Sequence, residues 1–278
     1  MPESPELEAL RIRLEPTLQG EVLSRVDVFP ARAHLLRSPP AAFKDLVVGR
    51  RVTQVGRRGK HLILNLAGGP EGTGNPVLQL IVNPMLGGRF QLAGDGARPS
   101  ATVFELGFGP ERVLRLLDPR GMSRTYLTAR PDLDVPGWSE LGPEADQVGA
   151  EVGLEAFRRS LRRRRDELKD LLRNQTFLAG IGNAYSDEIL FSAALLPLRR
   201  RVSLTPADEI ALYQAIPRIL TGALESILAQ PPGDLSRQDR SFLTVHGRVG
   251  GACPRCGHRL SQLGTKREPL TFCRGCQV

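Results

Sequence analysis

The spacing of apolar residues changes once along this 278-residue chain, and that change limits the fold more than any other feature. Up to about residue 130, short apolar runs typical of strands are separated by turns. Leu62, Leu64 and Leu66 fall on one face of such a run, as in a strand with one buried face. Prolines, glycines and acids replace this pattern over 131–146, and a helical period follows. The sequence therefore predicts a β domain followed by a helical domain.

Eight strands are expected in the first part, over 22–29, 51–55, 61–66, 77–82, 89–92, 103–108, 113–117 and 125–128. Short strands separated by turns are typical of a β-sandwich or barrel. A helix should precede them, because Ser4 suits the N-cap and Pro5 suits the first helical position. Pro16 is expected to end that helix.

The helical part opens with apolar residues on one helix face, namely Leu154, Phe157, Leu161, Leu168 and Leu171. The other face carries a run of arginines, Arg158, Arg159, Arg162, Arg163, Arg164 and Arg165. Such a run is usually a solvated face, although in a basic protein it can also contact phosphates. Thr205-Pro206 predicts the start of a second helix, in which Pro217 is a candidate kink.

The formal charge of +8 and the pI of about 9.9 favour a polyanionic partner, above all nucleic acid. Charge that serves only solubility is the alternative. No 18-residue apolar run is present, and the N-terminus lacks a basic segment followed by an apolar one. We therefore expect neither a membrane span nor a signal peptide, and a cytoplasmic location that is nucleoid-associated in a bacterium.

All four cysteines lie near the C-terminal end, in two C-x2-C pairs separated by sixteen residues: Cys253, Cys256, Cys273 and Cys276. Four thiolates at this spacing predict one tetrahedral Zn²⁺ site formed by two knuckles of a hairpin. With four sulfur ligands the metal has no open position, so its role should be structural. His258 is expected to be a hairpin residue rather than a ligand.

The first residues after the methionine, Pro2-Glu3-Ser4-Pro5-Glu6, offer a reactive group. Removal of Met1 would leave a proline secondary amine, with a pKa near 8 rather than the roughly 10.4 of a lysine. A secondary amine that attacks an aldehyde-level carbon forms an iminium, which is covalent catalysis with an electron sink. The alternative is an ordinary frayed start of a helix.

Two glycine-containing turns are candidate phosphate sites. Gly180-Ile-Gly182-Asn183 joins one helix to the next, and the N–H groups of the second helix and the Asn183 amide are expected to face outward as a phosphate clamp. Gly56–Lys60 forms a cationic turn between two strands. Taken singly, an ordinary helical hairpin and a surface turn explain both.

Together these features resemble the formamidopyrimidine-DNA glycosylase/endonuclease VIII family over nearly the whole chain. The matching motifs are Pro2-Glu3 with Glu6, Gly56–Lys60, Leu141-Gly-Pro-Glu144, the helix–two-turn–helix over 175–197, and the cysteine hairpin that ends at Gln277. The resemblance implies a multidomain α+β fold. It comprises an N-terminal catalytic β-sandwich with a leading helix (1–135), a linker (136–151), a helix-two-turn-helix DNA-binding domain (152–240) and a C-terminal zinc finger with a β-hairpin (241–278).

The implied activity is base-excision repair of damaged double-stranded DNA by a monomer that combines DNA glycosylase and AP lyase activities. The flipped-out nucleotide is attacked at C1′ by the Pro2 nitrogen, with Glu3 as acid/base, Glu6 nearby, and β,δ-elimination following. Lys60, Asn183 and a hairpin arginine, Arg267, would hold phosphates. Lys169 matches a family lysine in the DNA-binding part.

The sequence departs from the family pattern at three places. The hairpin arginine usually stands where Glu268 is, one residue after Arg267. The loop Asn83–Arg89 resembles the one that supplies a methionine wedge, here Met85, but its usual histidine is absent. In Asp118-Pro-Arg120-Gly-Met122, glycine and methionine replace a second arginine and a phenylalanine, so Arg120 and Met122 remain to fill the space of the flipped base.

Substrate choice depends on the segment before the cysteine hairpin. Only 231–240 lies where the oxoguanine-specific branch has a longer cap, which favours oxidised pyrimidines. An 8-oxoguanine/formamidopyrimidine-specific glycosylase is the alternative. A catalytically idle DNA-damage-binding protein and a zinc-ribbon transcription or RNA-binding factor are rivals from other classes.

Overall fold

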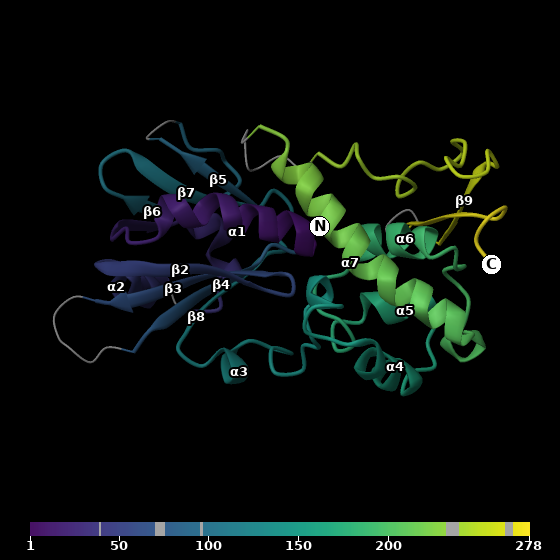
Figure 1. Cartoon of the computed structure of the whole chain (residues 1–278). Helices are drawn as coiled ribbons and strands as arrows, with labels where there is room; N and C mark the ends of the chain where they lie inside the picture. Colours follow the sequence, from purple (N-terminus) through teal and green to yellow (C-terminus); the bar gives the residue numbers. More distant parts are fainter. Residues whose placement is uncertain (39, 70–75, 95–96, 232–238, 265–268) are drawn as a thin grey trace. The chain divides into compact units, whose positions relative to one another are not determined.

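The computed structural model describes residues 1–38, 40–69, 76–94, 97–231, 239–264 and 269–278. The chain forms two compact units (Figure 1). The first unit contains Met1–Pro2, Glu6–Ser139 and the described part of 230–238. The second unit contains Glu3–Pro5, Glu140–Ala229 and the described part of 239–278. Arg267 and its neighbours 265, 266 and 268 lie outside the described residues.

The first unit is built on two four-stranded antiparallel sheets. One sheet has the order β1-β6-β7-β5, with β1 Leu23–Val28, β6 Thr102–Phe108, β7 Arg112–Leu117 and β5 Arg89–Ala93. The other has the order β2-β3-β4-β8, with β2 Arg50–Arg58, β3 His61–Gly68, β4 Leu78–Asn83 and β8 Arg124–Thr128. The eight expected strands and the β-sandwich are confirmed.

One apolar core joins the inner faces of both sheets with the helices α1 (Ser4–Leu18) and α2 (Pro40–Val47). Leu7, Leu14 and Leu18 of α1 are at most 1% exposed. The prediction that Pro16 ends this helix is wrong, because α1 continues to Leu18. Pro16 lies in the last turns, where its missing N–H affects a single bond, and burial of Leu18 favours continuing the helix.

The remaining elements of the first unit and all those of the second are short, except for one helix. They are η1 (Pro30–Leu35), α3 (Pro131–Asp134), η2 (Ala145–Gln147), α4 (Leu154–Arg162), α5 (Leu168–Arg173), α6 (Asn183–Ser192), η3 (Arg201–Ser203), α7 (Pro206–Leu228), β9 (Leu260–Gly264) and β10 (Pro269–Cys273). The long helix α7 is drawn in light green in Figure 1. No helix in the described ranges is both long and apolar enough to cross a membrane.

The single helical face expected over 154–171 is divided between α4 and α5. The guanidinium of Arg201 donates to the carbonyl oxygens of Arg162 and Arg164, at 2.9 Å each. These bonds satisfy carbonyls released at the end of α4, so the helix can stop there. The apolar period persists across the break because Phe157, Leu161, Leu168 and Leu171 enter the same core.

The start of α7 agrees with the sequence. Thr205 caps the helix, Pro206 follows it, and Asp208 completes a reciprocal capping box. Pro217 lies inside the helix.

Candidate active site

The side chain of Glu3 caps the N-terminus of α6. Glu3 is 1% exposed, and its carboxylate accepts the backbone N–H groups of Gly182, Ala184 and Tyr185, with Ala184 at 2.9 Å. The backbone of Ser4 adds a bond to the Gly180 carbonyl at 3.0 Å. A helix N-terminus favours a negative charge, so the carboxylate next to Pro2 has a fixed position.

Both glycines of the 180–182 turn are required by this arrangement. Gly180 has φ +104, and a Cβ there would lie 2.7 Å from Ser4 Cβ. A Cβ on Gly182 would lie 2.5 Å from Glu3 Cδ. The N–H groups expected to face outward as a phosphate clamp are instead bound to Glu3. That expectation was wrong because the chain's own N-terminal carboxylate occupies the helix end.

Lys169 and Asn183, both predicted to bind DNA, meet at one carbonyl oxygen. Lys169 Nζ and Asn183 Nδ2 donate to Pro269 O at 3.2 and 3.0 Å, and Lys169 Nζ also pairs with Asp187 Oδ1 at 2.6 Å. Lys169 is 4% exposed, and burial lowers its pKa although Asp187 opposes that shift. Asn183 Oδ1 is buried and has no hydrogen-bond partner among the described residues.

The acidic residues after Asn183 hold two other segments of the second unit. Asp187 Oδ2 lies 2.8 Å from His246 Nδ1 and accepts the Thr271 N–H at 3.3 Å. Glu188 accepts three successive backbone N–H groups, those of 244–246. Sequence reasoning missed this pair of carboxylates, because the two segments that they hold lie more than fifty positions away.

Lys60 lies in the turn between β2 and β3, half-buried, after Gly59 with φ +53. The turn is held by Arg57, which donates to the Gly59 carbonyl at 3.2 Å and to Glu8 at 2.9 Å. Burial raises the pKa of Glu8, but hydrogen bonds from Arg11 and Arg57 outweigh burial and lower it. The turn is thereby tied to α1, which carries Glu6 in its first turn.

The two loops predicted to enter the duplex, 83–89 and 118–122, meet at Asp118. This carboxylate is fully buried and accepts the backbone N–H groups of 120–123, at 2.6–3.1 Å. The 83–89 loop packs on Asp118 through Gly87, where a Cβ would lie 2.0 Å from Asp118 Oδ1. Arg120 is exposed and Met122 is 39% exposed at the tip.

In the 83–89 loop, the exposed apolar side chain is Leu86 and not Met85. Leu86 is 42% exposed, whereas Met85 is half-buried, has φ +50 and donates its backbone N–H to Asn83 Oδ1 at 3.0 Å. The sequence predicts Met85 as the wedge, because the family loop that it resembles supplies a methionine. Its neighbour Leu86 was missed, since exposure is not visible in a motif.

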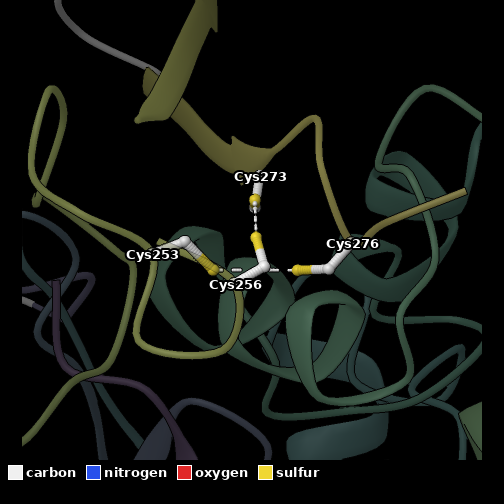
Figure 2. Close-up of side chains that lie close together, drawn as sticks. All are labelled: Cys253, Cys256, Cys273 and Cys276. Carbon is white, nitrogen blue, oxygen red and sulfur yellow. Dashed lines mark hydrogen bonds between the residues drawn. The ribbon is translucent and has the colours of Figure 1, made fainter. Parts of the chain in front are cut away.

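The four cysteines converge as the sequence predicts (Figure 2). All four Sγ atoms lie within 4.8 Å of one another, with Cys256–Cys273 at 3.4 Å and Cys253–Cys276 at 3.7 Å. A tetrahedron with Zn–S bonds of about 2.3 Å has edges of about 3.8 Å, so the cluster fits one Zn²⁺. β9 and β10 pair antiparallel beside it.

Comparison with known families decides the assignment. The N-terminal domain of formamidopyrimidine-DNA glycosylase matches residues 1–125, and the helix-two-turn-helix (H2TH) domain of the same enzyme matches residues 141–230. The chain belongs to the formamidopyrimidine-DNA glycosylase family. It is therefore a member of a family of DNA glycosylases that act in DNA repair, as the resemblance of its motifs predicts.

Relatives and solved structures span the whole chain. The formamidopyrimidine-DNA glycosylase of Moorella thermoacetica is 35% identical over 276 residues, covering 95% of this chain and 94% of that protein. The enzyme of Thermus thermophilus is 33% identical over 287 residues, covering 100% and 98%. The Lactococcus lactis enzyme in complex with DNA containing N7-benzyl-Fapy-dG has a TM-score of 0.86 at 25% identity, covering 99% of each chain. Another structure of that enzyme holds DNA with an abasic site, with a TM-score of 0.84.

Proposed function

We propose that this protein is a bifunctional DNA glycosylase and AP lyase that uses the Pro2 amine as its nucleophile. The observation that carries the proposal is the buried Glu3 carboxylate, bound by three backbone N–H groups at the start of α6. It fixes an acid/base group one residue from the N-terminal amine. A role in binding alone gives no reason to fix such a group beside a nucleophile.

The proposed chemistry begins when the Pro2 nitrogen attacks C1′ of an extruded nucleotide. A bond from nitrogen to C1′ forms, the glycosidic bond breaks, and the base leaves with a proton. Glu3, with Glu6 nearby, supplies and accepts protons at the sugar as its ring opens to the iminium. Loss of a C2′ proton then expels the 3′ phosphate, and a second elimination expels the 5′ phosphate.

Other residues would hold the duplex. We assign Lys60, Asn183 and Arg267 to phosphates around the lesion. The Asn183 amide carries two N–H groups, so the one not bound to Pro269 can donate to a phosphate. Leu86 and Met122 are the apolar side chains suited to wedge between bases, with Arg120 beside them.

One Zn²⁺ held by Cys253, Cys256, Cys273 and Cys276 would stabilise the β9–β10 hairpin, whose connecting sequence includes Arg267. Gln277 supports this role, because its amide bonds both the Cys273 N–H at 2.7 Å and the Leu195 carbonyl at 2.8 Å. The last knuckle is thus attached to the chain just after α6.

Two observations bear on the lesion. The relatives are named for formamidopyrimidines, which are ring-opened purines. The short 231–240 segment favours oxidised pyrimidines, and the Lactococcus lactis enzyme has been crystallised with DNA containing one. We propose that this protein excises both classes of lesion and that it prefers oxidised pyrimidines to 8-oxoguanine.

The test is borohydride trapping on a duplex with one abasic site, followed by mass mapping of the crosslink. An adduct on Pro2 is the expected result. A protein with one additional residue before Pro2 should bind the same duplex but give no adduct. Tight binding without an adduct, from protein with a verified proline terminus, would instead support the idle damage-binding alternative.

A further inference from the structure

His61 and Asn83 form a hydrogen-bonded pair between two loops of the first unit, and the chemistry proposed above makes no use of it. His61 begins β3 and Asn83 ends β4, which pair antiparallel with Leu62 opposite Val82. The two side chains are therefore neighbours at one end of the sheet. His61 Nε2 lies 3.3 Å from Asn83 Nδ2, and the Trp138 ring contacts the His61 ring edge-on, with centroids 5.4 Å apart.

The partners of this pair fix the orientation of each side chain. His61 Nδ1 lies 3.2 Å from the Arg58 carbonyl oxygen, which can only accept, so Nδ1 carries a proton. Asn83 Oδ1 accepts the Met85 N–H at 3.0 Å, which turns Nδ2 towards His61. Asn83 Nδ2 therefore donates to Nε2 of a neutral imidazole. Each of these three hydrogen bonds then joins one donor to one acceptor.

This chain of bonds joins two loops with different proposed roles. On one side, the bond from His61 to Arg58 closes the turn that contains Lys60. On the other side, Met85 has φ +50, a conformation unfavourable for a residue with a side chain, and the Asn83 bond holds its N–H there. The exposed Leu86 follows directly.

We propose that His61 and Asn83 are positioning residues that hold the Leu86 loop in place relative to the Lys60 turn. The phosphate contact and the wedge then engage the duplex together. This inference rests on the proposed function, which gives both loops their roles. Extruding a damaged base requires the wedge, whereas cleavage at a site that already lacks its base requires no base to be unstacked.

Two variants test the pair against a matched control. Asn83→Ala removes both Asn83 bonds, and His61→Phe keeps a ring beside Trp138 without its polar atoms. The control is Asn65→Ala, since Asn65 of β3 also bonds across strands, to Gln54 and Gln79. We expect the two variants to lower single-turnover excision of a damaged base by about 10- to 100-fold. Asn65→Ala should stay within about twofold of wild type.

Two further readouts separate positioning from general damage to the fold. Strand cleavage at a preformed abasic site should fall by less than about threefold in Asn83→Ala, which leaves the His61–Arg58 bond in place. The losses from Asn83→Ala and Leu86→Ala should be non-additive, because both act through one loop. Trp138 is the only tryptophan, and its emission should change in Asn83→Ala but not in Asn65→Ala.

Equal losses on damaged-base and abasic duplexes, or full additivity with Leu86→Ala, would overturn the positioning role. Unchanged excision by Asn83→Ala would do the same while leaving the proposed function intact. Wild-type protein that is inactive on both duplexes would overturn the proposed function and this inference together.

Discussion

The backbone of Gly182 touches the Glu3 carboxylate so closely that a Cβ on Gly182 would lie 2.5 Å from Glu3 Cδ. The same carboxylate accepts the Gly182 N–H across a sequence separation of 179 residues. The position of the Glu3 carboxylate is therefore set by the 180–182 turn, and changes in that turn should act on the chemistry proposed for Pro2.

Gly182→Ala should lower base excision by about 100-fold, because the added methyl group must displace the Glu3 carboxylate, which we propose as the acid/base. Single-turnover excision on a lesion duplex measures the loss. Gly153→Ala is the matched control, since a Cβ at Gly153 meets nothing within 4 Å. Excision by Gly182→Ala at the control rate would show that Glu3 does not need this position.

Asp118→Asn should destabilise the protein by about 1–3 kcal/mol, because the amide presents N–H groups to backbone donors. Burial raises the pKa of Asp118, but hydrogen bonds from Ser123, Met122 and Arg120 outweigh burial and lower it. A depressed pKa gives stability that is present above the unfolded value, about 3.9, and is lost as pH falls through the folded value.

Urea unfolding at several pH values checks this. The difference in unfolding free energy between wild type and Asp118→Asn should be constant near neutrality and shrink below about pH 4. Asp27→Asn serves as the control, since Asp27 forms an exposed pair with Arg25. A difference that grows on acidification would contradict the assigned hydrogen bonds.

Lys169→Met should destabilise the second unit by about 3–5 kcal/mol, because it leaves the buried Asp187 carboxylate without its lysine partner. Denaturant unfolding measures the change. Lys44→Met, at an exposed position of α2, should stay within about 0.5 kcal/mol of wild type. Equal stability of the two variants would mean that the Lys169–Asp187 pair contributes nothing to the fold.

The salt dependence of DNA binding should separate Lys60 from Lys169. A lysine that contacts a phosphate contributes about one unit to the slope of log K against log salt. Lys60→Met should therefore reduce the slope by about 1, whereas Lys169→Met should leave it unchanged because its ammonium is bound to Asp187. A reduced slope in Lys169→Met would assign Lys169 a direct phosphate contact.

Cys253→Ser should lose the bound zinc and weaken DNA binding, because one of four ligands is missing. Elemental analysis of the purified protein gives the zinc content, and titration of a labelled duplex gives the affinity. His258→Asn should retain one zinc per chain, since His258 is outside the cysteine group. Full zinc content in Cys253→Ser would exclude the four-thiolate site.

The elements and motifs that depend on local pattern were predictable from the sequence. Eight strands follow from short apolar runs separated by turns, and the cysteine cluster follows from C-x2-C spacing. The end of α1 was mispredicted at Pro16, since local propensity favoured a stop there and the tertiary burial of Leu18 prevailed.

The contacts that assemble the site were not predictable, because they join distant residues. The capping of α6 by Glu3 spans the chain, so the turn was interpreted as an open phosphate site. The exposure of Leu86 beside a half-buried Met85 depends on a left-handed backbone residue that no motif encodes.

Asp187 and Glu188 are consecutive residues of α6. Asp187 accepts the N–H of Thr271 in β10, and Glu188 accepts the N–H groups of 244–246 before the first knuckle. Two segments of the cysteine module, one before the first knuckle and one in β10, are thus attached to α6 independently of any ion. Amide exchange should accordingly stay slow at 244–246 and at Thr271 after chelation while it accelerates within the knuckles, at 253–256 and 273–276. Without the ion, the knuckles would lose order while the module stayed attached to α6, so the metal could bind again without refolding of the domain.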